Sequence, residues 1–253
     1  RQILRRKGKK TERFITQYPS IFILACLVLM TTGVSFVKIL DKTVKRRTMP
    51  IEYLVVHYTA NFNTRADAKM NAIYLRNTNR AGTHYCVDDR EIIQCTEEHN
   101  VAYAVGDRRW AGFVPKFWLD NKIKNNNSLS FEMCLGGGRN DSLILDHTAQ
   151  CLAWQLVNKG LGLDHVVRHH DVTGKHCPRF CYTDEKWDQK REDAAWLRFK
   201  ELVGKYHKIQ LWRKKMAKEK AQALESQMPA KSQNVKEMLK IWWFVVNYCT
   251  FVP

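Results

Sequence analysis

The chain has 253 residues, of which 45% are hydrophobic, so it can bury one substantial core and still carry extensions. Its formal charge of +17 would suit a nucleic-acid-binding protein, but that charge lies at the two ends. Residues 1–48 carry 12 Lys or Arg against 2 Asp or Glu, residues 200–253 carry 11 against 4, and residues 49–199 carry 19 of each. The neutral middle argues against a basic nucleic-acid groove. Basic ends beside apolar runs favour contact with a membrane or an anionic wall.

The first 48 residues are predicted to be a basic leader. From Phe14 to Val37 the chain has no charged residue over 24 positions, and a membrane span needs roughly 20 predominantly apolar residues. We therefore expect a possible transmembrane segment at about 14–37. Met49 directly precedes the first predicted strand, so the leader is interpreted either as an anchor or as sequence upstream of the true start. The first interpretation predicts a membrane-anchored protein, and the second a cytoplasmic protein before its release.

The middle of the chain alternates strand and helix patterns. Short β-branched and aromatic runs predict strands, and apolar residues at helical spacing predict helices, one of them with Thr64 as its N-cap and another stopped by Gly160. The predicted strands cover 51–57, 83–88, 91–95, 128–134 and 165–167, and the predicted helices cover 64–76, 146–159 and 183–202. This order predicts an α/β domain at 49–204, with a mixed central β-sheet flanked by helices in three layers.

Two further segments are set apart by their composition. Residues 101–127 form a long polar and aromatic stretch, and a loop of this length in a compact domain is usually functional. We predict that its residues Asp107, Arg108, Arg109 and Trp110 contact a substrate. Residues 205–253 are predicted to be a basic helical extension followed by an aromatic tail that is too short to span a bilayer.

The stretch from His165 to Cys181 is rich in the ligands that zinc prefers. A closed structural site could be made of His165 or His169 with Cys177 and Cys181. The alternative is an open catalytic site, in which His57, His169 and Cys177 bind one zinc ion and leave a fourth position for water. His57 follows the apolar run LVV, where a histidine alone would more often be a core residue, and the second ligand group favours the catalytic interpretation.

Two charged residues suit the chemistry of such a site. Glu132 interrupts the apolar strand LSFEMC, where a carboxylate is costly unless it has a partner or a function. It could accept a proton from a water molecule at the metal, or it could be a salt-bridged structural residue. Lys175 lies two residues before Cys177 and could stabilise an oxyanion, although a solvent-facing lysine is the simpler interpretation.

Four separated motifs then resemble the zinc-dependent N-acetylmuramoyl-L-alanine amidases of type 2, a family that includes phage and bacterial cell-wall lysins and the peptidoglycan recognition proteins. The motifs are HYTA at 57–60, THYCVDDREIIQ at 83–94, SFEMC at 130–134 and HHDVTGKHCPR at 169–179. The resemblance covers about residues 51–200 and keeps the motifs in order. It implies the fold of that family, with peptidoglycan as the partner of a monomeric enzyme at the cell envelope.

The resemblance also assigns roles to residues. His57, His169 and Cys177 match the family's zinc ligands, Glu132 falls where many members place a catalytic glutamate, and Lys175 matches an active-site lysine. Thr83 stands where some members have a tyrosine, so the base role is assigned to Glu132. Thr83 and His84 are expected to be substrate contacts, and His84 is expected either in the substrate groove or beside the metal ligands as their support, but not as a ligand.

The implied reaction is hydrolysis of the amide between N-acetylmuramic acid and L-alanine. A peptidoglycan-binding module without activity and a structural zinc domain with Cys181 as fourth ligand remain as alternatives.

Overall fold

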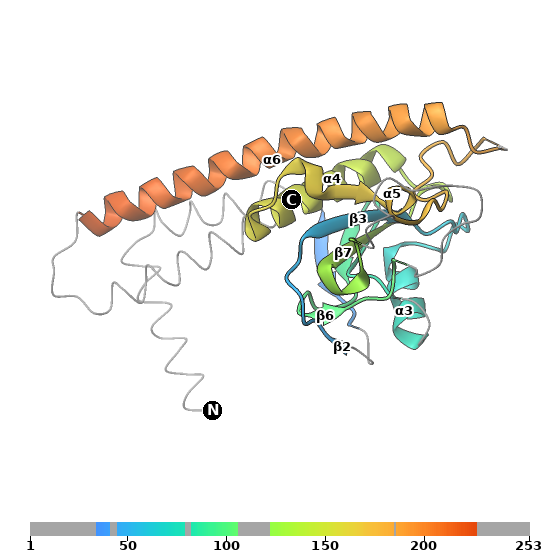
Figure 1. The fold of residues 1–253 in the computed structure, drawn as a ribbon, viewed down its shortest axis with the longest axis horizontal. Coiled ribbons are helices and arrows are strands. Elements are labelled where there is room, and N and C mark those ends of the chain that lie inside the picture. The colour runs from blue at the N-terminus through green and yellow to red at the C-terminus, as the bar shows by residue number, and fades with distance from the viewer. Residues whose placement is uncertain (1–33, 41–44, 79–81, 106–121, 185, 227–253) are drawn as a thin grey trace. The chain divides into compact units, whose positions relative to one another are not determined.

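The computed structural model describes residues 34–40, 45–78, 82–105, 122–184 and 186–226, and a six-stranded mixed β-sheet forms its centre (Figure 1). In spatial order the strands are β1 (Ser35–Lys38), β5 (Glu91–Gln94), β4 (Tyr85–Val87), β7 (Ser128–Met133), β3 (Tyr53–Tyr58) and β8 (Val166–Arg168). The β4–β5 hairpin is antiparallel, and the other neighbours are parallel. A separate antiparallel pair joins β2 (Lys45–Arg46) to β6 (Asn100–Val101).

Helices cover both faces of the sheet, which gives the three layers that the sequence predicts (Figure 1). Because successive strand residues point to opposite faces, two neighbours on β4 identify the layers. Cys86 packs in a cluster with Ala68 and Ala72 of α3 (Ala68–Asn77). The hydroxyl of Tyr85 instead accepts a hydrogen bond from Gln155 of α4 (Asp141–Lys159). The other helices in the described part of the chain are η1 (Asn125–Asn127), η2 (Leu163–His165), α5 (His169–Thr173) and α6 (Gln189–Ser226).

The helix boundaries correct several predictions. Helix α3 begins at Ala68 and not after Thr64, because the Asp67 carboxylate caps it by accepting the backbone N–H of Met70. Helix α4 begins five residues earlier than predicted, where Asn140 accepts the N–H of Leu143, and it ends at Gly160 as expected. The predicted helix at 183–202 begins only at Gln189.

The end of the predicted leader belongs to the sheet. Residues 35–37, expected as the last part of a hydrophobic segment at 14–37, form with Lys38 the edge strand β1, which pairs in parallel with β5. The guanidinium of Arg47 donates hydrogen bonds to the carbonyls of Glu98, Asn100 and Ser128, and to those of Asn125 and Asn126. Residues 1–33 lie outside the described part of the chain. Within the described residues, no helix has the length and apolar character needed to cross a membrane.

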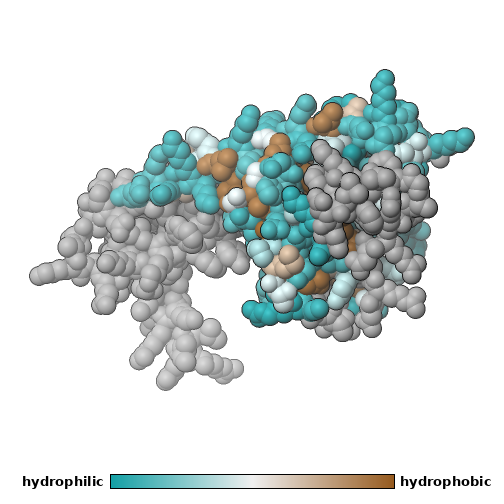
Figure 2. Space-filling view, in the orientation of Figure 1, coloured by the Kyte–Doolittle hydropathy of each residue, from teal (hydrophilic) through white to brown (hydrophobic). Residues whose placement is uncertain are grey.

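Helix α6 is longer than predicted, since the pattern assigned to a final domain helix and a separate extension forms one helix of 38 residues. Residues 34–212 make up one compact unit, and of the other unit the structure describes only the last part of α6. The face of α6 seen in Figure 2 is mainly hydrophilic, with small apolar patches. Its exposed apolar residues include Leu197 and Trp212, each 61% exposed. The aromatic tail at 227–253 lies outside the described residues.

Candidate metal and active site

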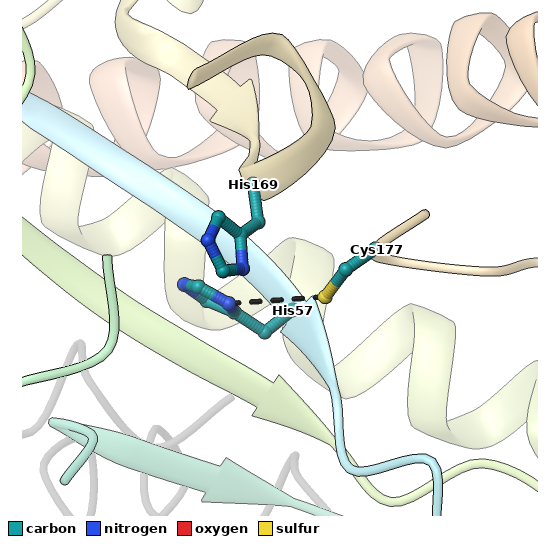
Figure 3. A group of neighbouring side chains, drawn as sticks. All are labelled: His57, His169 and Cys177. Carbon is teal, nitrogen blue, oxygen red and sulfur yellow. Dashed lines mark hydrogen bonds between the residues drawn. The ribbon is translucent and has the colours of Figure 1, made fainter. Parts of the chain in front are cut away.

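Three metal-ligating side chains come together at the carboxyl ends of neighbouring parallel strands. His57 is the fifth residue of β3, His169 directly follows β8 as the first residue of α5, and Cys177 lies in the loop after α5 (Figure 3). Their ligand atoms all lie within 4.8 Å of one another, and all three residues are buried. Ligands commonly bind at this end of parallel strands, because several loops diverge there.

The short helix α5 returns the chain to the strand end and so places Cys177 beside the two histidines. The sequence predicts a loop from Asp171 to Pro178, but the first three residues of that stretch, up to Thr173, are helical. Gly174 ends the helix in the left-handed conformation, where glycine is favoured. The backbone N–H of His170 then donates to the Cys177 carbonyl at 2.6 Å, which closes the turn.

The geometry of these side chains fits a zinc ion. Tetrahedral zinc with ordinary Zn–N and Zn–S bonds holds its nitrogen and sulfur ligands about 3.5 Å apart. The Cys177 Sγ and the His57 Nδ1 are 3.8 Å apart. The His169 Nδ1 is buried and has no hydrogen-bond partner among the described residues. Because buried polar atoms in native proteins are nearly always paired, this nitrogen indicates a missing partner in the site.

The protonation states of the ligands also suit a metal. Burial lowers the pKa of His57 well below its usual value, and burial with the charge of Lys175 lowers the pKa of His169 to about 3. Both imidazoles are therefore neutral at pH 7, which is the form that binds metals. Burial and the nearby Glu132 raise the pKa of the Cys177 thiol to about 12, so metal binding must displace its proton. The backbone N–H of Tyr58 donates to the Cys177 sulfur and favours the thiolate.

Glu132 lies beside the metal ligands on the same face of the sheet. In the parallel register of β3 and β7 it is the direct partner of His57, so both side chains point the same way. Its Oε2 atom is buried without a hydrogen-bond partner in the described residues. Burial raises the pKa of Glu132 to about 7, against the opposing effect of Lys175. A carboxyl with this pKa can accept and return a proton near neutral pH.

Lys175 is partly buried in the turn between α5 and Cys177. Its positive charge contributes to the lowered pKa of His57 and His169 and opposes the raised pKa of Glu132, although burial is the larger cause in each case. The structure therefore brings together all five residues predicted for the metal and the chemistry. They are His57, Glu132, His169, Lys175 and Cys177.

Of the predicted substrate contacts, the structure describes only Thr83 and His84. His84 is fully buried, and its Nδ1 accepts the backbone N–H of Ser130, so it is a structural residue and not a groove residue. Burial and the charge of Arg47 lower the pKa of His84 to about 3. Thr83 is also buried, and its hydroxyl donates to the Ser130 carbonyl at 2.9 Å. The predicted contacts in the long loop, Asp107, Arg108, Arg109 and Trp110, lie outside the described residues.

Sequence reasoning missed one residue that holds the site together. The Glu192 carboxylate, buried on α6, accepts the N–H groups of Phe180 and Cys181 and so fixes the loop after Cys177. Its position among other charged helix residues gives no sequence signal. Cys181 is partly exposed, and it does not belong to the group of metal-ligating atoms found in the described residues.

Comparisons with known proteins agree with this geometry. The family model described as "N-acetylmuramoyl-L-alanine amidase" matches residues 47–180, which include all five residues of the site. The chain is 30% identical over 147 residues to the N-acetylmuramoyl-L-alanine amidase XlyB of Bacillus subtilis, a match that covers 56% of this chain and 41% of XlyB. It is 30% identical over 164 residues to the amidase CwlA of the same organism, covering 62% of this chain and 53% of CwlA. The chain thus spans about half the length of these relatives.

The fold matches solved structures as well. The catalytic domain of XlyA superimposes with a TM-score of 0.53 at 23% identity, over 67% of this chain and 99% of that domain. The Staphylococcus aureus hydrolase AmiA, solved in complex with its ligand, gives a TM-score of 0.53 at 17% identity, over 76% of this chain and 92% of AmiA. At these identities the likeness establishes the fold alone, which is the predicted mixed sheet flanked by helices.

Proposed function

The chain belongs to the N-acetylmuramoyl-L-alanine amidase family, and from this premise we propose that it is a zinc-dependent peptidoglycan hydrolase. The bond cleaved is the amide between the lactyl group of N-acetylmuramic acid and the L-alanine of the stem peptide. One observation carries the proposal above the others. A carboxylate whose buried Oε2 atom has no partner in the described residues stands in register beside an open set of three buried metal ligands.

His57, His169 and Cys177 would hold a single zinc ion. Zinc bound there would supply a Lewis acid that polarises the scissile carbonyl and lowers the pKa of a water ligand. Three protein ligands leave one position for water or substrate, as catalytic sites require and closed structural sites do not. The location of Cys181 outside the ligand group supports the open site over a structural one.

The chain's own charged residues supply the proton transfer and the charge stabilisation. Glu132 takes the proton of the attacking water as the C–O bond forms, and it passes that proton to the amide nitrogen as the C–N bond breaks. The products are the muramoyl carboxylic acid and the free amino terminus of L-alanine. Lys175 places its positive charge near the carbonyl oxygen, which gains negative charge in the transition state. The low polarity that raises the pKa of Glu132 to about 7 makes it a better base near neutral pH.

Peptidoglycan as the substrate places the site of action at the cell envelope. The neutral charge of residues 49–199 supports a wall substrate over a nucleic acid. The amidase site is formed within one chain, and the proposal therefore needs no second copy.

The proposal is tested with the full chain, zinc and purified peptidoglycan. New L-alanine amino termini are expected, without release of reducing sugar ends. Wall binding by the folded, zinc-loaded protein without new amino termini would replace the enzyme with a binding module. Release of other amino termini would show a different peptidase specificity.

A further inference from the structure

Three rings pack together at the turn that runs from Lys175 to Cys177, and we name His170, His176 and Trp187 the ring cluster. His176 and Trp187 stack with their ring centroids 4.4 Å apart and an angle of 7° between the rings. The His170 ring lies 5.0 Å from Trp187 and 6.2 Å from His176. His170 is only 2% exposed. The metal-ligand group of the described residues contains neither of these histidines, so the cluster has a role other than metal binding.

The side chain of His170 is hydrogen-bonded to the first residue of this turn. Its Nδ1 atom lies 2.9 Å from the carbonyl oxygen of Lys175. Because a carbonyl oxygen only accepts hydrogen bonds, the Nδ1 atom carries a proton and donates it. This bond ties helix α5, which carries His170, to the Lys175 end of the turn.

The backbone ties the other end of the turn to the same residue. The His170 N–H donates to the Cys177 carbonyl at 2.6 Å, and the Cys177 N–H donates to the Lys175 carbonyl at 2.7 Å. The second of these bonds lies within the turn, so it does not connect the turn to α5. A contact from the Lys175 N–H to the Thr173 hydroxyl is long, at 3.4 Å. The imidazole of His170 therefore makes the shorter of these two side-chain bonds to the Lys175 backbone.

Trp187 packs against this arrangement and is itself fixed to α6. Its Nε1–H donates at 3.0 Å to the side chain of Gln189, the first residue of the helix. Gln189 in turn donates to Asp193, which accepts a hydrogen bond from Arg168 at 2.6 Å. Arg168 is the last residue of β8, directly before α5. The support of the turn therefore extends beyond residues 47–180, which the family model matches.

We propose that His170 is a positioning residue of the enzyme, and that Trp187 holds its imidazole against the turn. The imidazole fixes the Lys175 carbonyl, so that the turn presents the Lys175 ammonium group to the reacting carbonyl and the Cys177 sulfur to the zinc ion. This inference rests on the proposed function. In this role His170 contacts neither substrate nor metal, and it acts through the two residues that do.

Three substitutions of His170 separate its hydrogen bond from its bulk. Asparagine places an amide nitrogen where the imidazole has Nδ1, glutamine places one where it has Nε2, and leucine has no donor. In the zinc-loaded full chain, His170→Leu and His170→Gln are expected to lower kcat about tenfold at unchanged KM, which corresponds to about 1.4 kcal/mol. His170→Asn is expected to stay close to the wild-type kcat. Equal kcat values for His170→Leu and His170→Asn would overturn the proposal.

The stability of the same variants is expected to follow a different order. Asparagine is smaller than histidine and leaves a gap beside Trp187, whereas leucine fills more of that space. His170→Asn should therefore unfold at a lower midpoint than His170→Leu, although its kcat is higher. If kcat instead fell in step with the unfolding midpoint, His170 would be a core residue only, and the proposal would fail.

A second background tests whether the effect passes through Lys175. Lys175→Met removes the ammonium group and keeps most of the length of the side chain. His170→Leu should lower kcat about tenfold in the wild type and by less than about threefold in Lys175→Met, because the group that it positions is already gone. Equal losses in the two backgrounds would contradict the coupling.

Variants of Trp187 test the second part of the ring cluster. Trp187→Phe keeps a ring beside His170 and should retain the wild-type kcat, whereas Trp187→Leu should reproduce the loss seen in His170→Leu. Trp212→Leu is the matched control, because Trp212 is 61% exposed on the same helix. An equal effect of Trp187→Leu and Trp212→Leu would show that Trp187 does not hold the imidazole.

Two measurements on the full chain need no turnover and so keep the inference separate from the proposed activity. Nitrogen NMR of the zinc-loaded protein should show a proton on the His170 Nδ1. Zinc should bind His170→Leu about tenfold more weakly than it binds the wild type or His170→Asn. These results without any amide cleavage by the wild type would sustain the positioning of the turn and reject the amidase. Amide cleavage by a wild type that has no proton on this Nδ1, or that binds zinc no better than His170→Leu, would do the reverse.

Discussion

Replacing Glu132 with glutamine is expected to stabilise the metal-free protein, by an amount that grows with pH. The Oε2 atom of Glu132 is buried with no hydrogen-bond partner in the described residues, and burial raises the pKa of this carboxyl to about 7. Ionising it in the folded state therefore costs free energy that the unfolded chain, with its exposed carboxyl, does not pay. Glutamine keeps the shape of the side chain and cannot ionise.

The size of the effect follows from the shift in pKa. Between the ordinary pKa of 4.5 and the raised pKa of about 7, the folded protein keeps a proton that the unfolded chain has lost. Stability from this group is therefore greatest below pH 4.5, falls as the pH rises through this window, and is constant above it. At 1.36 kcal/mol for each unit, the full penalty at pH 8 is about 3 kcal/mol, and the partial exposure of the residue reduces it to about 2 kcal/mol. At pH 5 the penalty is below about 1 kcal/mol.

Urea unfolding of the metal-free protein at pH 5 and pH 8 measures this difference. Glu132→Gln should unfold at higher urea than the wild type at pH 8 and at nearly the same urea at pH 5. Glu201→Gln, at an exposed position of α6, serves as the control and should show no such pH dependence. If Glu132→Gln destabilised the protein at pH 8, the carboxylate would have a charged partner in the folded state, and the reasoning would be refuted.

Two other groups of variants test the site and its frame. Cys177→Ser should weaken zinc binding by more than about a hundredfold. This exceeds the usual effect of removing a residue that only hydrogen-bonds to a metal ligand, because Cys177 is itself a ligand. Cys181→Ser should still bind one zinc ion per chain and unfold at the same midpoint. Loss of the metal from this variant would instead support the structural zinc site with Cys181 as fourth ligand. Arg47→Ala removes hydrogen bonds to five backbone carbonyls and should cost about 3 kcal/mol of unfolding free energy. The adjacent exposed Arg46→Ala should cost less than about 0.5 kcal/mol, and equal losses would show that the Arg47 contacts contribute little.

The sequence was most informative where residue type and spacing carry the chemistry. The two histidines and the cysteine have few uses in common other than metal binding. A glutamate in an apolar strand is conspicuous because burying a carboxylate costs free energy unless it has a partner or a function. The strand patterns also identified the hairpin of β4 and β5 and the carboxyl end of β3. These features depend on short segments, so local patterns are sufficient to find them.

The rest depends on contacts between distant segments. Strand β1 has no strong alternation, and it is a strand only because the edge of β5 accepts it. Arg47 looks like any other residue of a basic leader, yet it reaches carbonyls 51 to 81 positions away. His84 was expected as a substrate contact because of its place in a motif that resembles the family, but its partner is the backbone of β7. No local pattern gives the position of such partners.

The central claim is that one zinc ion at His57, His169 and Cys177 acts together with Glu132. The most direct measurement adds zinc stepwise to the metal-free full chain and follows the release of L-alanine amino termini from peptidoglycan. Turnover should rise in proportion to zinc and stop rising at one ion per chain. Glu132→Gln should bind the same single ion and release almost no amino termini. Full turnover without zinc, or undiminished turnover by Glu132→Gln, would contradict the claim.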